Sequence, residues 1–176
     1  MKKVIILFIL AVILTGTSCK ALNIKADPPA EQVGYVNVEY DHFQSAEELA
    51  EKAVTVVEGT VTEIKNILVN EKEIDGTVQT SPRKLYTIRV LKTYKGEPKE
   101  ELKMQGFGGV MDNIVYTETN APLIREGQKY LFFLTEAYDG KVMTYNPAQS
   151  LVDLESGKSY DGSITLEDVL ACFDAK

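Results

Sequence analysis

The feature that most constrains the fold is a series of short segments in which β-branched and aromatic residues alternate with polar ones. In residues 85–94 (LYTIRVLKTY), Tyr86, Ile88 and Val90 fall on one face and the residues between them on the other, as expected for a strand with a buried face. Weaker strand patterns cover residues 35–40, 54–64, 102–105, 129–134, 142–145 and 149–154. Such a chain folds around β-sheets.

Turn signals separate these segments at short intervals. They include Asp75-Gly76, residues 95–98 and Asp139-Gly140, of which Asp139-Gly140 is the sharpest hairpin signal. Gly59 falls inside a strand pattern, where glycine marks a bulge or a barrel corner. Closely spaced strands and turns predict a mainly β fold, a small antiparallel OB-type barrel or a sandwich, and not a parallel sheet.

Two short helices accompany the strands. Residues 45–48 (SAEE) form a capping box that predicts a helix from Ser45 to about Ala53. Thr165 and Asp168 predict the start of a second helix, whose apolar face is formed by Leu166, Val169, Leu170 and Phe173.

The alternation also predicts the core. We expect one barrel core with contributions from Val54, Val56, Ile88, Val90, Leu131 and Phe133. If the helices cover the outside of the barrel, the inward set shifts by one residue. At roughly 140 residues the folded part buries about two-thirds of its unfolded surface, so it needs no disulfide or metal for stability.

The N-terminus carries an export signal. Lys2 and Lys3 precede an apolar run over residues 4–14, and small and polar residues lead to Cys19. As a helix this run spans about 17 Å, well short of the roughly 30 Å of a bilayer core. We expect residues 1–18 to be a signal peptide and Cys19, in a lipobox-like Gly-Thr-Ser-Cys, to carry lipid. The alternative is cleavage near Ala21 and release of a secreted protein.

Three regions follow from this interpretation. Residues 1–18 are the signal, residues 19–34 a lipid-anchored flexible tether containing Asp-Pro-Pro-Ala, and residues 35–176 the folded domain. A tether of this length reaches at most about 50 Å, enough to hold a domain clear of a membrane. The expected location is the outer surface of the cell membrane.

Composition excludes several functions. The net charge is −7, and −9 once Lys2 and Lys3 leave with the signal, which does not suit nucleic acid or an anionic lipid surface. Two cysteines and one histidine are too few for a zinc cluster or a disulfide framework. We expect no cofactor and no metal. Cys172 is expected to be a free thiol, or to pair with Cys19 if that residue stays unmodified.

Candidate catalytic motifs have simpler explanations. Residues 106–109 (GFGG) lack a following Lys-Ser or Lys-Thr, so we interpret them as a barrel corner and not a phosphate cradle. His42 beside Asp41 lacks a nucleophile at a defined spacing. The protein is therefore not expected to be an enzyme, and a carboxylate-dependent hydrolase is the less favoured alternative.

Two connections are longer than ordinary hairpin turns, residues 70–84 and 106–125. Long loops are where ligand sites arise on a β scaffold. The second combines flexible glycines with apolar and polar side chains, and its candidate ligand-binding residues are Phe107, Asp112, Asn113 and Tyr116. Alternatively, Phe107 and Ile114 simply plug the barrel end.

The order of motifs resembles a known family. Gly59-Thr-Val, Tyr94-Lys-Gly, Phe107-Gly-Gly and Gly127-Gln-Lys-Tyr-Leu-Phe-Phe-Leu resemble the OB-type barrel of netrin-like and tissue-inhibitor-of-metalloproteinase-like domains, especially their exported bacterial relatives. The resemblance covers residues 45–154. The inhibitors ligate a protease zinc through an N-terminal cysteine locked against the barrel, whereas Cys19 lies outside the barrel and lacks the supporting cysteines.

These observations favour an exported, lipid-anchored surface domain that binds a protein or cell-envelope ligand. A soluble secreted inhibitor-like module is the alternative, and it differs in needing no lipid on Cys19.

Overall fold

The computed structural model describes residues 32–72 and 75–174. The predicted signal peptide, Cys19 and most of the tether lie outside the described residues. Strand β1 (Gln32–Val36) begins within the predicted tether, so the predicted domain start at residue 35 lies inside a strand. In the described ranges, no helix has the length and apolar character needed to cross a membrane.

The prediction of a mainly β fold with two short helices is confirmed. A six-stranded sheet has the order β4-β3-β2-β7-β8-β9, and a three-stranded sheet has the order β1-β6-β5. The remaining strands are β2 (Thr55–Lys72), β3 (Val78–Lys95), β4 (Glu101–Phe107), β5 (Gly109–Met111), β6 (Ile114–Glu118), β7 (Lys129–Leu134), β8 (Leu151–Asp153) and β9 (Lys158–Ser159). The helices are α1 (Ala46–Lys52) and α2 (Leu166–Asp174).

Strands β2 and β3 form one long antiparallel hairpin that turns at Asp75-Gly76. The predicted loop at residues 70–84 is therefore wrong, because both strands continue to the turn. The polar residues there belong to a two-stranded arm whose side chains bond across the strands, as where the Thr80 hydroxyl donates to Asn70 at 2.8 Å. The polar character of residues 70–84 therefore reflects the solvent exposure of this arm and not an irregular backbone.

Isolated bridges complete a small ring of strands. In the larger sheet β4, β3, β2 and β7 are antiparallel neighbours. Bridges join Leu134 of β7 to Thr144, and Val142 to Met104 of β4. The segment after the Asp139-Gly140 turn thus lies between β7 and β4, and links both ends of this row. This arrangement is consistent with the small antiparallel barrel or sandwich that the sequence predicts.

The long β2 strand bends where the sequence predicts it. The register between β2 and β3 shifts between Glu58 and Gly59, which confirms the predicted bulge. A Cβ atom on Gly59 would lie 2.6 Å from Cγ2 of Ile88 and 3.0 Å from the carbonyl oxygen of Arg89. Glycine is therefore required by the close approach of β3.

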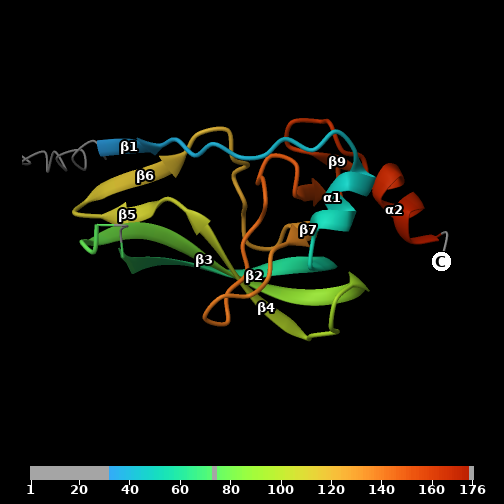
Figure 1. Cartoon of the computed structure of the whole chain (residues 1–176), viewed down its shortest axis with the longest axis horizontal. Helices are drawn as coiled ribbons and strands as arrows, with labels where there is room; N and C mark the ends of the chain where they lie inside the picture. Colours follow the sequence, from blue (N-terminus) through green and yellow to red (C-terminus); the bar gives the residue numbers. More distant parts are fainter. Residues whose placement is uncertain (1–31, 73–74, 175–176) are drawn as a thin grey trace, which may run out of the picture. The chain divides into compact units, whose positions relative to one another are not determined.

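The prediction of a single core is wrong, because buried residues form two clusters on opposite faces of the larger sheet. The first cluster lies inside the ring and includes Ile88, with Val90 packed against it. The second contains Val56, Leu131 and Phe133, and is covered by α1 and α2 (Figure 1). Helices bury the outer face, so the five consecutive residues from Tyr130 to Leu134 of β7 are all buried.

Val54 belongs to neither core and is 47% exposed. It lies just before β2, where its backbone N–H donates to the carbonyl of Leu134. In β2 and β7 the inward set is shifted by one residue, as the alternative prediction allowed, whereas in β3 Ile88 belongs to the interior core and Val90 packs against it, as predicted. Members of the interior cluster include Val57, Val61, Tyr86, Met104, Tyr130, Phe132 and Leu134.

Both helices begin where the sequence predicts. The Glu48 N–H donates to the Ser45 hydroxyl at 3.2 Å, and the Asp168 N–H donates to the Thr165 hydroxyl at 3.2 Å. In a capping box the Glu48 carboxylate would accept from the backbone N–H of Ser45. Here it accepts instead from the backbone N–H of Gln44, at 2.7 Å. The C-terminal end of α1 is held by Lys95, whose ammonium donates to the carbonyls of Ala50 and Glu51.

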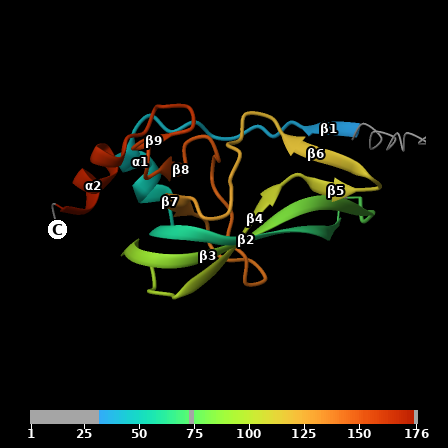
Figure 2. The same ribbon diagram turned by 180° about the vertical axis from the view of Figure 1, so that it is seen from behind.

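The predicted long connection at residues 106–125 is also partly wrong, because it contains β5 and β6. These strands pair antiparallel, and β1 pairs with β6 in the parallel direction. Strand direction cannot be inferred from such short patterns, and the crossover between β1 and β6 includes α1 and the long hairpin. Figures 1 and 2 show this small sheet beside the outer part of the hairpin, away from the helices.

Candidate functional site

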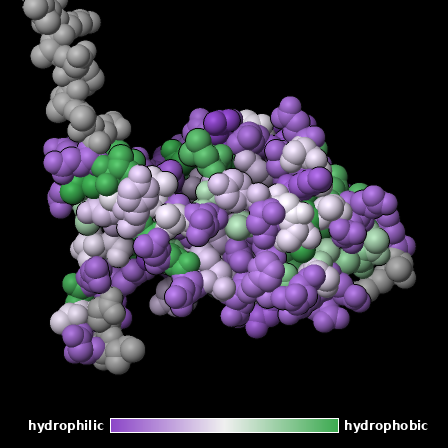
Figure 3. All heavy atoms as spheres, turned by 90° about the horizontal axis from the view of Figure 1, so that it is seen from above, coloured by the Kyte–Doolittle hydropathy of each residue, from purple (hydrophilic) through white to green (hydrophobic). Residues whose placement is uncertain are grey.

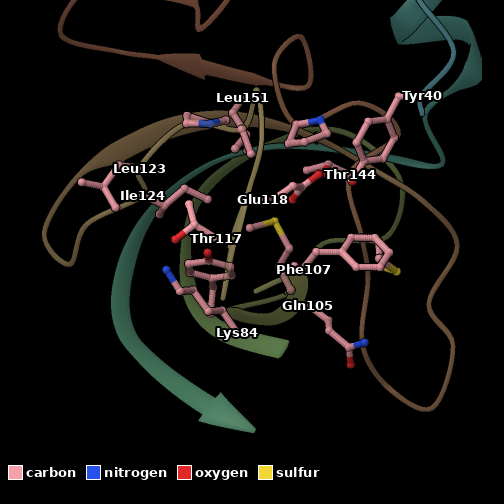
Figure 4. Close-up of a pocket in the computed structure, with 17 residues that line it drawn as sticks. Tyr40, Lys84, Gln105, Phe107, Thr117, Glu118, Leu123, Ile124, Thr144 and Leu151 are labelled. Atoms are coloured by element: carbon pink, nitrogen blue, oxygen red, sulfur yellow. Dashed lines mark hydrogen bonds between the residues drawn. The ribbon is translucent and has the colours of Figure 1, made fainter. Parts of the chain in front are cut away.

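A pocket of about 90 Å³ lies at one mouth of the strand ring. Its floor is formed by residues that also belong to the interior core, among them Tyr86, Met104, Ile124 and Leu151. Its sides come from segments far apart in the sequence, including Tyr40 after β1 and Glu118 at the end of β6 (Figure 4). The mouth of a β-barrel is a common place for ligands to bind.

Glycines in residues 106–109 shape the wall of the pocket. A Cβ atom on Gly106 would lie 3.1 Å from the Tyr86 ring, so glycine at this position leaves room for the ring beside β4. Gly108 and Gly109 adopt φ of 89° and 129°, a region that favours glycine. They turn the chain from the larger sheet into β5, which confirms the predicted corner.

A buried acid faces the pocket. Glu118 is only 9% exposed, and it accepts a hydrogen bond from the Tyr40 hydroxyl. Burial raises the pKa of Glu118, although the Tyr40 hydrogen bond and the positive charge of Arg83 act in the opposite direction. Tyr86 and Glu118 line the same pocket, and burial, followed by the charge of Glu118, raises the pKa of the Tyr86 hydroxyl.

A buried cation, Arg83, lies close enough to Glu118 for its positive charge to act on the carboxylate. Arg83 is 5% exposed, and Nη2 donates to both carboxylate oxygens of Glu71 at 2.6 and 2.8 Å. Its guanidinium carbon lies 3.9 Å from the centroid of the Phe107 ring, which is within cation–π range. Arg83 therefore ties the outer hairpin to the wall of the pocket. Among the described side chains, its Nε atom has no hydrogen-bond partner.

The four predicted site residues do not form one cluster. Phe107 lines the pocket. Asp112 and Asn113 form the turn between β5 and β6, with φ of 53° and 62°, and do not line the pocket. Tyr116 pairs with Gly109 across the small sheet, and its ring occupies the space above Gly34, where a Cβ atom would lie 2.8 Å away. Asp112 and Asn113 are therefore explained by the turn that they form, and Tyr116 by its packing in the small sheet.

The sequence reasoning missed Tyr40, Tyr86 and Glu118. Tyr86 was placed correctly on a strand face, but a tyrosine at a core position carries no sign of lining a pocket. Glu118 is an acid at the end of an apolar strand, and this is the one signal that could have drawn attention to it. Tyr40 meets Glu118 only through the tertiary fold, since the two are far apart in sequence.

Other candidate groups do not assemble into a site. Cys172 is partly exposed and unpaired in the described part of the chain, and burial raises the pKa of its thiol. Among residues 32–72 and 75–174, no group of three His, Cys, Asp or Glu side chains is arranged to hold a metal ion. Asp161 accepts from the hydroxyls of Ser159 and Ser163, which fixes the turn before α2.

Exposed apolar side chains are scattered over the surface. Figure 3 shows a mostly hydrophilic face on which separate hydrophobic areas are divided by polar ones. Isolated apolar residues of this kind are normal on protein surfaces. The pocket differs from this surface in combining apolar walls with a buried acid.

Comparison with known proteins adds no assignment. No model of a known protein family matches the chain, and no curated protein matches it either. The resemblance to netrin-like and tissue-inhibitor-like domains stays a prediction.

Proposed function

We propose that this protein is an exported, lipid-anchored binding domain whose pocket receives one side chain of a protein partner. The observation that carries the proposal is the size and position of the pocket. Sites for whole small molecules usually measure about 300–1,000 Å³, whereas this one measures about 90 Å³. That space suits the end of one side chain, with the rest of the ligand lying outside on the surface.

The composition of the pocket supports a side-chain anchor. Phe107, Met104 and Ile124 supply apolar walls, and Glu118 supplies one oriented polar group. Binding hot spots on protein surfaces are commonly anchors of this kind, inserted into a desolvated pocket and surrounded by weaker contacts. A cell-envelope polymer is the alternative ligand and would be distinguished by the nature of the cross-linked product below.

The proposed address rests on the sequence alone. Lipid anchoring at the outer surface of the cell membrane is supported by the signal-like residues 1–18, by Cys19 and by the proline-containing tether. The native protein should partition into detergent, and the Cys19→Ser variant should not. Wild-type protein found only in the medium, with its N-terminus beyond Cys19, would contradict the anchor and leave the binding proposal standing.

Site-specific photo-cross-linking tests the binding proposal in cells that export the protein. A photoreactive phenylalanine replaces Leu123, an exposed residue at the rim of the pocket. The matched control carries it at Leu91, which is also exposed but lies on β3 outside the pocket. We expect a discrete protease-sensitive product from position 123 and none from position 91.

A second variant shows whether the pocket itself matters. Ala121 lines the pocket, so Ala121→Phe fills part of it and should abolish the product from position 123. Cross-linking at equal yield in the filled variant, or equal yield from both positions, would overturn the proposal. A product that resists protease and is degraded by envelope hydrolases would instead assign a polymer as the ligand.

A further inference from the structure

The chemistry of the pocket indicates which side chain it accepts, an inference that rests on the proposed function. We propose that the anchor is a lysine side chain of the partner, with its ammonium group at Glu118 and its methylene stem against the apolar walls. The argument depends on the hydrogen bonds of Glu118, the aromatic groups around it and the nearby cations.

Glu118 has bonding capacity left over. A carboxylate offers about four acceptor positions, and among the described residues only the Tyr40 hydroxyl donates to it. The side chain is nevertheless largely removed from water, which makes an unpaired charge costly. An incoming ammonium group supplies further donors and a second positive charge besides that of Arg83, whose hydrogen bonds go to Glu71 and not to Glu118.

The walls suit a cation on a thin apolar stem. Tyr40, Tyr86 and Phe107 contribute three aromatic rings to the lining, and aromatic faces attract ammonium groups that have lost part of their water. Figure 4 shows Tyr40 and Phe107 on the same side of the pocket, with Glu118 directed toward its centre. The methylene groups of lysine can pack on apolar side chains while the charge reaches a polar partner. A volume of about 90 Å³ suits the narrow end of one extended side chain and not a whole small molecule.

Resident cations leave Glu118 available. The Arg83 guanidinium is already engaged with both oxygens of Glu71 and stacked on Phe107. Lys84 also lines the pocket, but in the view of Figure 4 its amino group lies on the opposite side from Tyr40. No salt bridge joins either cation to Glu118 within the described residues.

The charge of the whole chain agrees with a basic partner. The net charge of −7, or −9 once Lys2 and Lys3 leave with the predicted signal, attracts basic proteins over several ångströms and raises the rate of encounter. The same charge disfavours acidic partners. This long-range effect does not select the anchor, but it brings lysine-rich surfaces to the mouth of the pocket.

Two small probes of similar size distinguish the contribution of the ammonium group to binding from that of the apolar stem. Binding of n-butylammonium and of 1-butanol to the purified protein is followed by chemical shifts of backbone amides, at constant ionic strength and pH 7.5. We expect butylammonium to shift Glu118, Thr117 and Ile124 and to bind at least fivefold more tightly than butanol. The isosteric Glu118→Gln variant should lose this preference and keep butanol binding. Asp112→Asn, which removes an acid outside the pocket, is the matched control and should change nothing.

The possible results distinguish failure of the lysine anchor from failure of the proposed binding pocket. Butanol binding as tight as that of butylammonium, or a preference unchanged in Glu118→Gln, would overturn the lysine anchor and leave the pocket as an apolar site. Shifts by neither probe at the pocket residues would contradict both proposals. A short peptide, acetyl-Gly-Lys-Gly-amide, should bind better than its norleucine counterpart, and the reverse order would also overturn the lysine anchor.

Discussion

Replacement of Phe133 by alanine tests the two-core arrangement most sharply. Phe132 and Phe133 are consecutive residues of β7, and both are 0% exposed. One faces the ring interior and the other the helices. In a sheet with one solvated face, one of two such neighbours would be exposed and its loss would cost little. Here each substitution to alanine should lower the free energy of unfolding by about 3–5 kcal/mol.

The assay is equilibrium unfolding in urea followed by circular dichroism. With a slope of about 2 kcal/mol per M, typical of a small domain, a loss of about 4 kcal/mol lowers the midpoint by about 2 M. Phe133→Leu and Phe132→Leu retain much of the volume and should cost about 1–2 kcal/mol, which keeps the test usable if an alanine variant does not fold. Val54→Ala, at a half-exposed position, should stay within about 0.5 kcal/mol of wild type. A change below about 1 kcal/mol for either phenylalanine to alanine would refute the two-core account.

Three further predictions concern local structure. Ser45→Ala removes the hydroxyl that accepts from the Glu48 N–H and should cost about 1 kcal/mol in urea unfolding; an unchanged midpoint would mean that α1 needs no cap. Asn113→Ala places alanine at φ of 62° and should cost about 1 kcal/mol, whereas Asn113→Gly should be neutral or stabilising; equal costs for both variants would contradict the turn geometry. Because burial raises the pKa of folded Glu118 above its ordinary value of 4.5, the folded state holds its proton more tightly, and the stability this contributes at low pH is lost as pH rises through the raised pKa. Wild type should therefore lose stability relative to Glu118→Gln as the pH rises above the ordinary pKa of 4.5, and a parallel pH dependence of the two midpoints would show that the pKa is not raised.

The strand framework could be predicted because local pattern and tertiary structure agree there. Alternation in residues 85–94 and the glycine at position 59 each correspond to a specific backbone requirement that the structure contains. The predicted caps at Ser45 and Thr165 likewise depend on contacts within one helical turn. These features can be predicted because they depend on residues that are close together in the sequence.

Long-range contacts explain what could not be predicted. Burial of both faces of β7 depends on α1 and α2, which are far apart in the sequence but pack together over one face of the sheet. The Glu118–Tyr40 hydrogen bond depends on the parallel pairing of β1 with β6, which brings the following segment across the ring mouth. Asp112 and Asn113 looked like ligand groups because the same residue types that bind ligands also tolerate a positive φ in tight turns.

The most direct test of the central claim is a measurement of contacts between a bound chain-like probe and the ring mouth. With methyl-labelled protein, intermolecular nuclear Overhauser effects from the terminal methyl of 1-butanol should reach the methyl groups of Ile124 and Leu151, which line the pocket floor. The Ala121→Phe variant should lose these effects while its fold, judged by the remaining methyl spectrum, stays intact. Effects confined to exposed residues such as Leu68 and Leu91, or persisting unchanged when the pocket is filled, would contradict the claim that this pocket is the binding site.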